Sequence, residues 1–93
     1  MKKGAYFINT ARGPLVDEFA LRTALECGHL GGAGLDVLRK EPMDEDCPLF
    51  GVDGCLITPH IAWAGVETRR RLMEIVEENI KAFLRGEPQN VVK

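Results

Sequence analysis

The sequence lacks the features that mark membrane, disulfide-stabilised and nucleic-acid-binding proteins. No apolar run approaches the ~20 residues that a transmembrane helix needs. The three cysteines, Cys27, Cys47 and Cys55, are odd in number and have no CxxC spacing, which argues against a disulfide framework and a zinc site. A formal net charge of -2 gives no electrostatic reason to expect nucleic acid or an anionic membrane as a partner. We therefore expect a cytoplasmic protein with free thiols and no bound metal.

Three short motifs look like ligand sites, but each has a simpler interpretation. The glycine-rich run 31–34 lacks the GxGxxG pattern of a nucleotide-binding loop and leads into a strand, which favours small residues at a close packing contact. The consecutive acids 44–46 lie in a polar loop, where such residues are usually solvated. The arginines 69–71 lie among glutamates and predict a solvated helix face.

Three short apolar segments predict strands. Residues 5–8 are continuously apolar, as strands buried on both faces are. Residues 33–37 and 55–58 form two further short runs, and each is followed by polar residues. Because a helical pattern separates the first two strands, we expect a parallel sheet with right-handed crossovers.

Two segments have helical patterns. The first begins at Asp17, a favourable N-cap, and ends at Gly28, where a left-handed glycine is common. The second covers residues 66–85 and repeats apolar residues at intervals of three and four. In the polar loop 38–54 we expect Pro48-Leu49-Phe50 to attach the loop to the core. At 93 residues the chain is the size of one small α/β domain, with the element order β-α-β-loop-β-α.

Polar residues follow each predicted strand. Arg12 follows the first strand, Asp36 lies near the end of the second and Glu41 follows it, and His60 follows the third. The carboxyl ends of parallel strands lie at one edge of a sheet, where α/β proteins place their ligands. The sequence therefore predicts that these four side chains converge on one rim.

The motifs on this rim resemble those of a known family. Asn9-Thr10-Ala11-Arg12-Gly13, then Gly34-Leu35-Asp36-Val37 with Glu41-Pro42, then Thr58-Pro59-His60-Ile61-Ala62 are similar to successive signatures of the D-isomer-specific 2-hydroxyacid dehydrogenases. The resemblance covers essentially the whole chain. The segment from His60 to Ala64, with Glu67-Thr68-Arg69, is most similar to the glycerate dehydrogenase and hydroxypyruvate reductase branch.

The resemblance implies a partial Rossmann-type (doubly wound) parallel sheet. In the family a GxGxxG turn holds the cofactor pyrophosphate, upstream of the Asn-Thr-Ala-Arg-Gly segment, and only residues 1–4 lie upstream here. We therefore expect residues 1–93 to form the C-terminal part of an NAD(P)-binding domain that lacks the first βαβ half. We expect helix 66–85 to pack on a substrate domain or a partner chain. We also expect little or no turnover from the isolated chain.

The family's chemistry suits three residue types on the rim. Reduction of a 2-oxo acid requires a hydride for the carbonyl carbon, a proton for its oxygen and a cation for the carboxylate. Arg12 suits the last task because a guanidinium is permanently charged and binds a carboxylate through two parallel donors, although an isolated arginine is more often in a surface ion pair. His60 suits the proton transfer because imidazole titrates near neutrality, and Glu41 would orient its ring. By resemblance, Arg12, Glu41 and His60 are the catalytic residues.

The resemblance also implies a nicotinamide site and a small substrate. Asp36 would contact the nicotinamide side of NAD, or it would instead cap or order a loop. Trp63 would line the same pocket, or it would instead be a core residue. NADP stays open, and so does the identity of the small D-2-hydroxy or 2-oxo acid. The residues that would line the cofactor pocket are Thr10, Ala11, Arg12, Asp36, His60, Ala62 and Trp63.

A second function belongs to a different class. The chain could be a non-catalytic interaction module that forms a homodimer or pairs with a separate N-terminal half. The first strand would then be an open sheet edge, and helix 66–85 would expose a broad apolar face.

Overall fold

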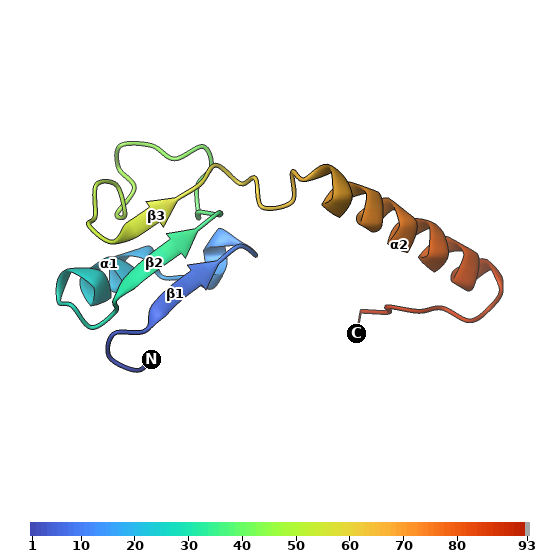
Figure 1. The fold of residues 1–93 in the computed structure, drawn as a ribbon, viewed down its shortest axis with the longest axis horizontal. Helices are drawn as coiled ribbons and strands as arrows, with labels where there is room; N and C mark the ends of the chain where they lie inside the picture. The colour runs from blue at the N-terminus through green and yellow to red at the C-terminus, as the bar shows by residue number, and fades with distance from the viewer. Residues whose placement is uncertain (93) are drawn as a thin grey trace. The chain divides into compact units, whose positions relative to one another are not determined.

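The computed structural model describes residues 1–92, and the chain divides into two compact units (Figure 1). The first unit, Met1–Ala62, contains a three-stranded sheet, and the second unit begins at Trp63. The strands are β1 (Tyr6–Asn9), β2 (Gly32–Leu35) and β3 (Cys55–Ile57). The helices are the 3-10 turn η1 (Gly13–Leu15), α1 (Glu18–Glu26) and α2 (Val66–Leu84). These elements confirm the predicted order β-α-β-loop-β-α.

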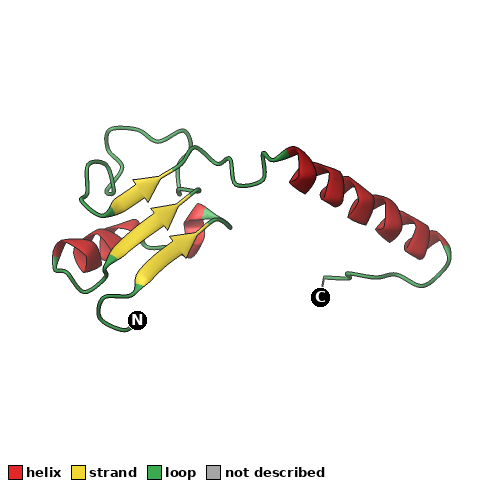
Figure 2. Cartoon of the chain, in the orientation of Figure 1, coloured by secondary structure: helices red, strands yellow, loops and turns green. Residues whose placement is uncertain are grey.

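The sheet is parallel and its order is β1-β2-β3. Ile8 pairs with Gly34, and Gly34 pairs with Leu56. Because all three strands run in one direction, their carboxyl ends lie at the same edge of the sheet (Figure 2). This arrangement confirms the predicted α/β, Rossmann-type parallel sheet.

Helix α1 covers one face of the sheet (Figures 1 and 2). Its N-cap is Asp17, whose carboxylate accepts a hydrogen bond from the Ala20 N–H at 3.0 Å, as the sequence predicted. It ends before Gly28, which has a left-handed φ of 67°. The core beneath the helix is made of Leu21, Leu25, Leu30, Ala33, Leu35, Leu38 and Leu49. Of the predicted Pro48-Leu49-Phe50 attachment, Leu49 is 1% exposed and belongs to the core, whereas Phe50 is 58% exposed.

The prediction that the first strand is buried on both faces is wrong. Tyr6 and Ile8 are 75% and 73% exposed, and Leu56 on β3 is 69% exposed. Residues at alternate positions of a strand point to opposite faces, and α1 covers only one of them. The other face of the sheet is therefore an exposed apolar surface within the first unit.

The second unit is dominated by α2, whose bounds agree with the predicted range 66–85 within one residue. The helix ends before Gly86, which has a φ of 79°. Its apolar residues remain exposed, including Leu72, Met73, Ile80, Phe83 and Leu84. No helix within residues 1–92 is long and apolar enough to cross a membrane.

Candidate functional site

The candidate site lies at the carboxyl edge of the sheet in the first unit. Thr10 follows β1, Asp36 follows β2, and His60 lies three residues beyond the end of β3. The last strand residues are still joined there, since the Asp36 N–H donates to the Asn9 carbonyl at 2.9 Å and the Thr58 N–H donates to the Leu35 carbonyl at 2.9 Å. The sheet therefore fixes the starting points of the three segments that carry the polar residues.

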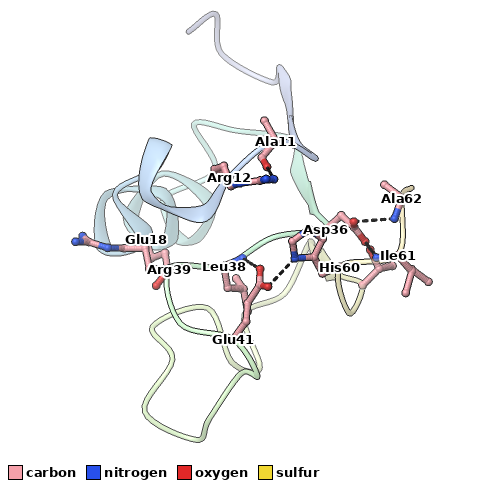
Figure 3. Close-up of polar contacts among 11 residues, drawn as sticks. Ala11, Arg12, Glu18, Asp36, Leu38, Arg39, Glu41, His60, Ile61 and Ala62 are labelled. Carbon is pink, nitrogen blue, oxygen red and sulfur yellow. Dashed lines mark hydrogen bonds and ion pairs between the residues drawn. The ribbon is translucent and has the colours of Figure 1, made fainter. Parts of the chain in front are cut away.

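Glu41 holds the ring of His60. The His60 Nδ1 lies 2.7 Å from Glu41 Oε2, and the Leu38 N–H donates to Glu41 Oε1 at 2.9 Å (Figure 3). The hydrogen bond from the Leu38 N–H is the largest cause that lowers the pKa of Glu41, and the hydrogen bond with the His60 ring is the second. An ionised carboxylate only accepts hydrogen bonds, so His60 presents a protonated Nδ1 to it and its Nε2 is left for another partner. The predicted pairing of Glu41 with His60 is thus present as a direct contact.

Asp36 holds the backbone on both sides of His60. Its Oδ1 accepts a hydrogen bond from the Thr58 hydroxyl at 2.5 Å. Oδ1 also accepts one from the Ile61 N–H at 2.9 Å, and Oδ2 accepts one from the Ala62 N–H at 2.8 Å (Figure 3). The Thr58 hydroxyl is the largest cause that lowers the pKa of Asp36. Asp36 is 5% exposed, so these contacts lie inside the protein. This geometry supports the loop-ordering alternative for Asp36.

Arg12 lies on the segment that follows β1, and its Nη1 donates to the Ala11 carbonyl at 2.7 Å (Figure 3). The Asn9 side chain fixes this segment, since its amide donates to the Arg12 carbonyl at 2.9 Å and its oxygen accepts from the Ala11 N–H at 3.1 Å. The next residue, Gly13, packs directly on the Leu38 backbone. The Arg12 segment therefore touches the same residue that anchors Glu41, although the guanidinium itself donates to Ala11.

The sequence analysis missed two buried polar residues that support the site. Asn9 is 7% exposed, and an Asn directly after an apolar strand was a signal for a loop-ordering side chain. Glu18 is 9% exposed and accepts a hydrogen bond from the Arg39 N–H at 2.8 Å. No local signal predicts this contact, because it joins α1 to the loop after β2 across 21 positions.

Two pockets flank the Asp36–Thr58 contact within the first unit. The first, the His60 pocket, has a volume of about 520 Å³ and is lined by His60, Glu41 and apolar residues that include Met43 and Pro59. The second, the sheet pocket, has a volume of about 420 Å³ and lies over the exposed face of the sheet. Its lining residues are Ile8, Thr10, Gly34, Leu35, Asp36, Leu56, Thr58, Ile61 and Ala62.

Three other predicted residues have different surroundings. Ala11 and Arg12 are exposed, and neither is among the residues that line either pocket. Trp63 belongs to the second unit and is 51% exposed, so a core position for it is wrong. The Arg69 guanidinium lies 4.3 Å from the centre of the Trp63 ring, a cation–π contact within that unit.

No group of three or more potential metal-ligating side chains gathers anywhere in residues 1–92. Asp44 instead pairs with Lys40, which lowers the pKa of its carboxyl group. Burial raises the pKa of the Cys55 thiol, and the neighbouring Cys47 contributes in the same direction.

Comparisons with known proteins agree on one family. Residues 1–62 match the family model described as D-isomer specific 2-hydroxyacid dehydrogenase, NAD binding domain. A hydroxypyruvate reductase of Blautia hydrogenotrophica is 50% identical over 99% of this chain and 29% of that protein. A glycerate dehydrogenase of Methylorubrum extorquens is 47% identical over 100% of this chain and 30% of that protein. The chain thus spans less than a third of the length of these relatives.

A solved structure extends the agreement to three dimensions. The D-isomer specific 2-hydroxyacid dehydrogenase from Xanthobacter autotrophicus Py2, in complex with NADPH and MES, is 44% identical with a TM-score of 0.76, over 100% of this chain and 38% of that one. The family model covers about two thirds of the chain, including both residues of the Glu41–His60 contact. The chain belongs to the D-isomer-specific 2-hydroxyacid dehydrogenase family, and its residues 1–62 match the NAD-binding domain of that family.

Proposed function

We propose that this chain supplies the acid–base pair and one wall of the nicotinamide site of an NAD(P)-dependent oxidoreductase that interconverts a small D-2-hydroxy acid and its 2-oxo acid. The 2.7 Å contact between Glu41 and His60, at the carboxyl edge of a parallel sheet, carries the proposal. The names of the relatives favour glycerate and hydroxypyruvate as the substrate pair.

His60 exchanges the proton in this proposal. Because Nδ1 faces Glu41, Nε2 is the ring nitrogen that gives a proton to the carbonyl oxygen of the 2-oxo acid during reduction. The same nitrogen takes the hydroxyl proton during oxidation. The ionised Glu41 accepts from Nδ1 and so keeps the neutral ring in one tautomer. Glu41 is itself held by the Leu38 N–H, so the ring has a fixed orientation.

Arg12 binds the substrate carboxylate in this proposal. Its guanidinium has five donors, and the contact with Ala11 uses only Nη1. The remaining donors form the planar fork that matches a carboxylate. The buried Asn9 side chain holds the Arg12 segment at the end of β1, which limits where the guanidinium reaches.

The sheet pocket fits the nicotinamide end of the cofactor. Its floor is the exposed apolar face of the strands, where Gly34 lies between Ile8 and Leu56 and adds no side chain. Such a surface suits a flat ring, and Thr10, Asp36 and Ala62 add polar groups or backbone at its edge. When bound there, the cofactor supplies or accepts the hydride. Of the other residues predicted to bind the cofactor, His60 lines the neighbouring His60 pocket, whereas Arg12 lines neither pocket.

The test compares two histidines. In the full natural protein that carries these residues, NADH oxidation is measured with hydroxypyruvate and with glyoxylate. We expect His60→Ala to lower kcat by roughly 10² to 10⁴, the range for the loss of a general acid. His29→Ala is the matched control, because that ring contacts the Met1 carbonyl rather than the site. An unchanged kcat for His60→Ala would remove His60 from the mechanism.

Titration of the 93-residue chain alone with NADH tests whether it binds the cofactor by itself. We expect weak binding or none, because the sequence contains no GxGxxG turn to hold the pyrophosphate. Binding is measured from the change in NADH fluorescence, and tight binding would contradict this expectation.

A second candidate function is association. The exposed apolar residues on α2 and on the open sheet face favour a chain that dimerises, pairs with a separate N-terminal half or packs against a substrate domain. Light scattering on the 93-residue chain measures the self-association directly. A monomer at all concentrations would contradict the homodimer, and the enzyme proposal would be unaffected.

A further inference from the structure

Both carboxylate oxygens of Asp36 are engaged by the turn that carries His60. Oδ1 accepts two hydrogen bonds and Oδ2 accepts one, which fills three of the roughly four acceptor sites of an ionised carboxylate. All three donors come from the segment 58–62, from residues on both sides of His60. Within residues 1–92 the ring of His60 contacts Glu41, and Asp36 makes no hydrogen bond to it.

His60 needs such support because its backbone is left-handed. Its φ is 55°, a conformation that is uncommon for residues other than glycine and persists only where the surroundings hold it. The His60 N–H donates to the Thr58 carbonyl at 3.0 Å, which closes a tight turn. Asp36 binds the turn through Thr58 on one side and through Ile61 and Ala62 on the other.

Two carboxylates therefore divide the task of placing the imidazole. Glu41 contacts the ring and Asp36 contacts the backbone that carries the ring. Each is fixed by its own strand end or loop, since Asp36 follows β2 directly and Glu41 accepts the Leu38 N–H. A ring that is held at Nδ1 but carried by a loose backbone would leave Nε2 without a fixed direction.

We propose that Asp36 is a positioning residue, which fixes the left-handed His60 turn through the Thr58 hydroxyl and the Ile61 and Ala62 amides so that the ring meets Glu41. The proposal rests on the proposed function, in which His60 exchanges the proton. It assigns Asp36 a role in kcat through His60, separate from any contact with the cofactor through the remaining acceptor site of Oδ2.

The first experiment is hydrogen exchange by NMR on the 93-residue chain. In the unchanged chain we expect the Ile61 and Ala62 amides to exchange at least about tenfold more slowly than in an unstructured peptide, as a hydrogen bond to a charged acceptor predicts. Asp36→Asn keeps one oxygen for Thr58 and Ile61 but turns an N–H₂ group toward the Ala62 N–H. We therefore expect the Ala62 protection to fall and the His60 backbone shifts to change. Asp53→Asn, at an exposed position, is the matched control and should change neither.

The second experiment is a double-mutant cycle in the full natural protein. If Asp36 acts through His60, Asp36→Asn lowers kcat in the unchanged protein and adds no further loss in the His60→Ala background. The KM for NADH should change less than the kcat does. A role only in cofactor binding would instead raise the KM for NADH equally in both backgrounds, and a role only in folding would lower the active fraction in both.

Each outcome supports or overturns the proposal. Unprotected Ile61 and Ala62 amides in the unchanged chain would overturn it, and this measurement needs no variant if Asp36→Asn fails to fold. Additive losses in the cycle would also overturn it. If His60→Ala leaves kcat unchanged while the amides are protected, the proposed function fails and the structural role of Asp36 stands.

Discussion

Gly13 packs so closely on the loop after β2 that a single methyl group there should destabilise the first unit. A Cβ at this position would lie 2.0 Å from the carbonyl carbon and oxygen of Leu38 and 2.4 Å from the Arg39 nitrogen. These are backbone atoms, and Leu38 is a core residue that is 7% exposed. Since real Cβ contacts under 3.0 Å essentially do not occur, the two segments would have to separate by about an ångström.

We expect Gly13→Ala to lower the free energy of unfolding by about 3 kcal/mol or more. Overpacking of a core usually costs about 1–3 kcal/mol, and the cost here is at the upper end because backbone rather than a flexible side chain must move. Gly34→Ala is the matched control, since the nearest atom to its Cβ is Ile8 Cγ1 at 4.0 Å. We expect this variant to be neutral or up to about 1 kcal/mol more stable, because alanine restricts the unfolded chain.

The comparison isolates the steric effect. Both variants replace glycine by alanine, so the change in the unfolded state is the same and cancels in the difference. Neither glycine has a positive φ, so left-handed backbone strain does not contribute. The effect should also reach the site, because Leu38, whose carbonyl would be displaced, donates its N–H to Glu41.

The assay is urea unfolding followed by far-UV circular dichroism, together with amide exchange in β2. Fluorescence of Trp63 is not a substitute, because that residue belongs to the second unit. If Gly13→Ala and Gly34→Ala unfold within about 0.5 kcal/mol of each other, the variation common among surface substitutions, the close contact between the Arg12 segment and Leu38 is refuted.

Three further predictions concern the core, a helix cap and the pH dependence. Leu49→Ala should cost about 2–5 kcal/mol in urea unfolding, because Leu49 is 1% exposed and its truncation leaves a cavity; a cost under about 0.5 kcal/mol, the range of surface positions, would contradict its burial. Asp17→Ala should cost about 1 kcal/mol and reduce the helical signal, since it removes the hydrogen bond to the Ala20 N–H; Asp17→Asn keeps the acceptor and should be close to neutral. The lowered pKa of Glu41 predicts a stability contribution that is present above the carboxyl's unfolded pKa of ~4.3 and is lost as the pH falls through the lower folded value. Glu41→Gln should remove this part of the acid dependence, and equal acid profiles for both proteins would refute the linkage.

The fold was predicted well where its signals are local. The Asp17 cap, the Gly28 stop and the spacing of apolar residues in α2 depend on a few adjacent positions, and the structure confirms them. The prediction for strand 5–8 failed because an apolar run shows that a strand avoids water but not how many of its faces are covered. Tyr6 is exposed because α1 covers only one side of the sheet.

The sequence by itself determined the polar residues that follow each strand and the family whose motifs they form. Parallel strands place their carboxyl ends at one edge, so local patterns were enough to predict that Glu41 and His60 would meet. The Glu41–His60 contact at 2.7 Å bears out that juxtaposition, while the chemical roles of both residues stay predictions.

Only the tertiary structure decided how the His60 turn is held. The hydrogen bonds that Asp36 accepts span 22 to 26 positions, and the one that Glu18 accepts from the Arg39 N–H spans 21, so no local spacing reveals them. The close contact of Gly13 with Leu38 likewise depends on how two loops approach each other. Such contacts are set by the packing of α1 and the loops on the sheet, because hydrogen-bond geometry is satisfied only after distant segments are brought together.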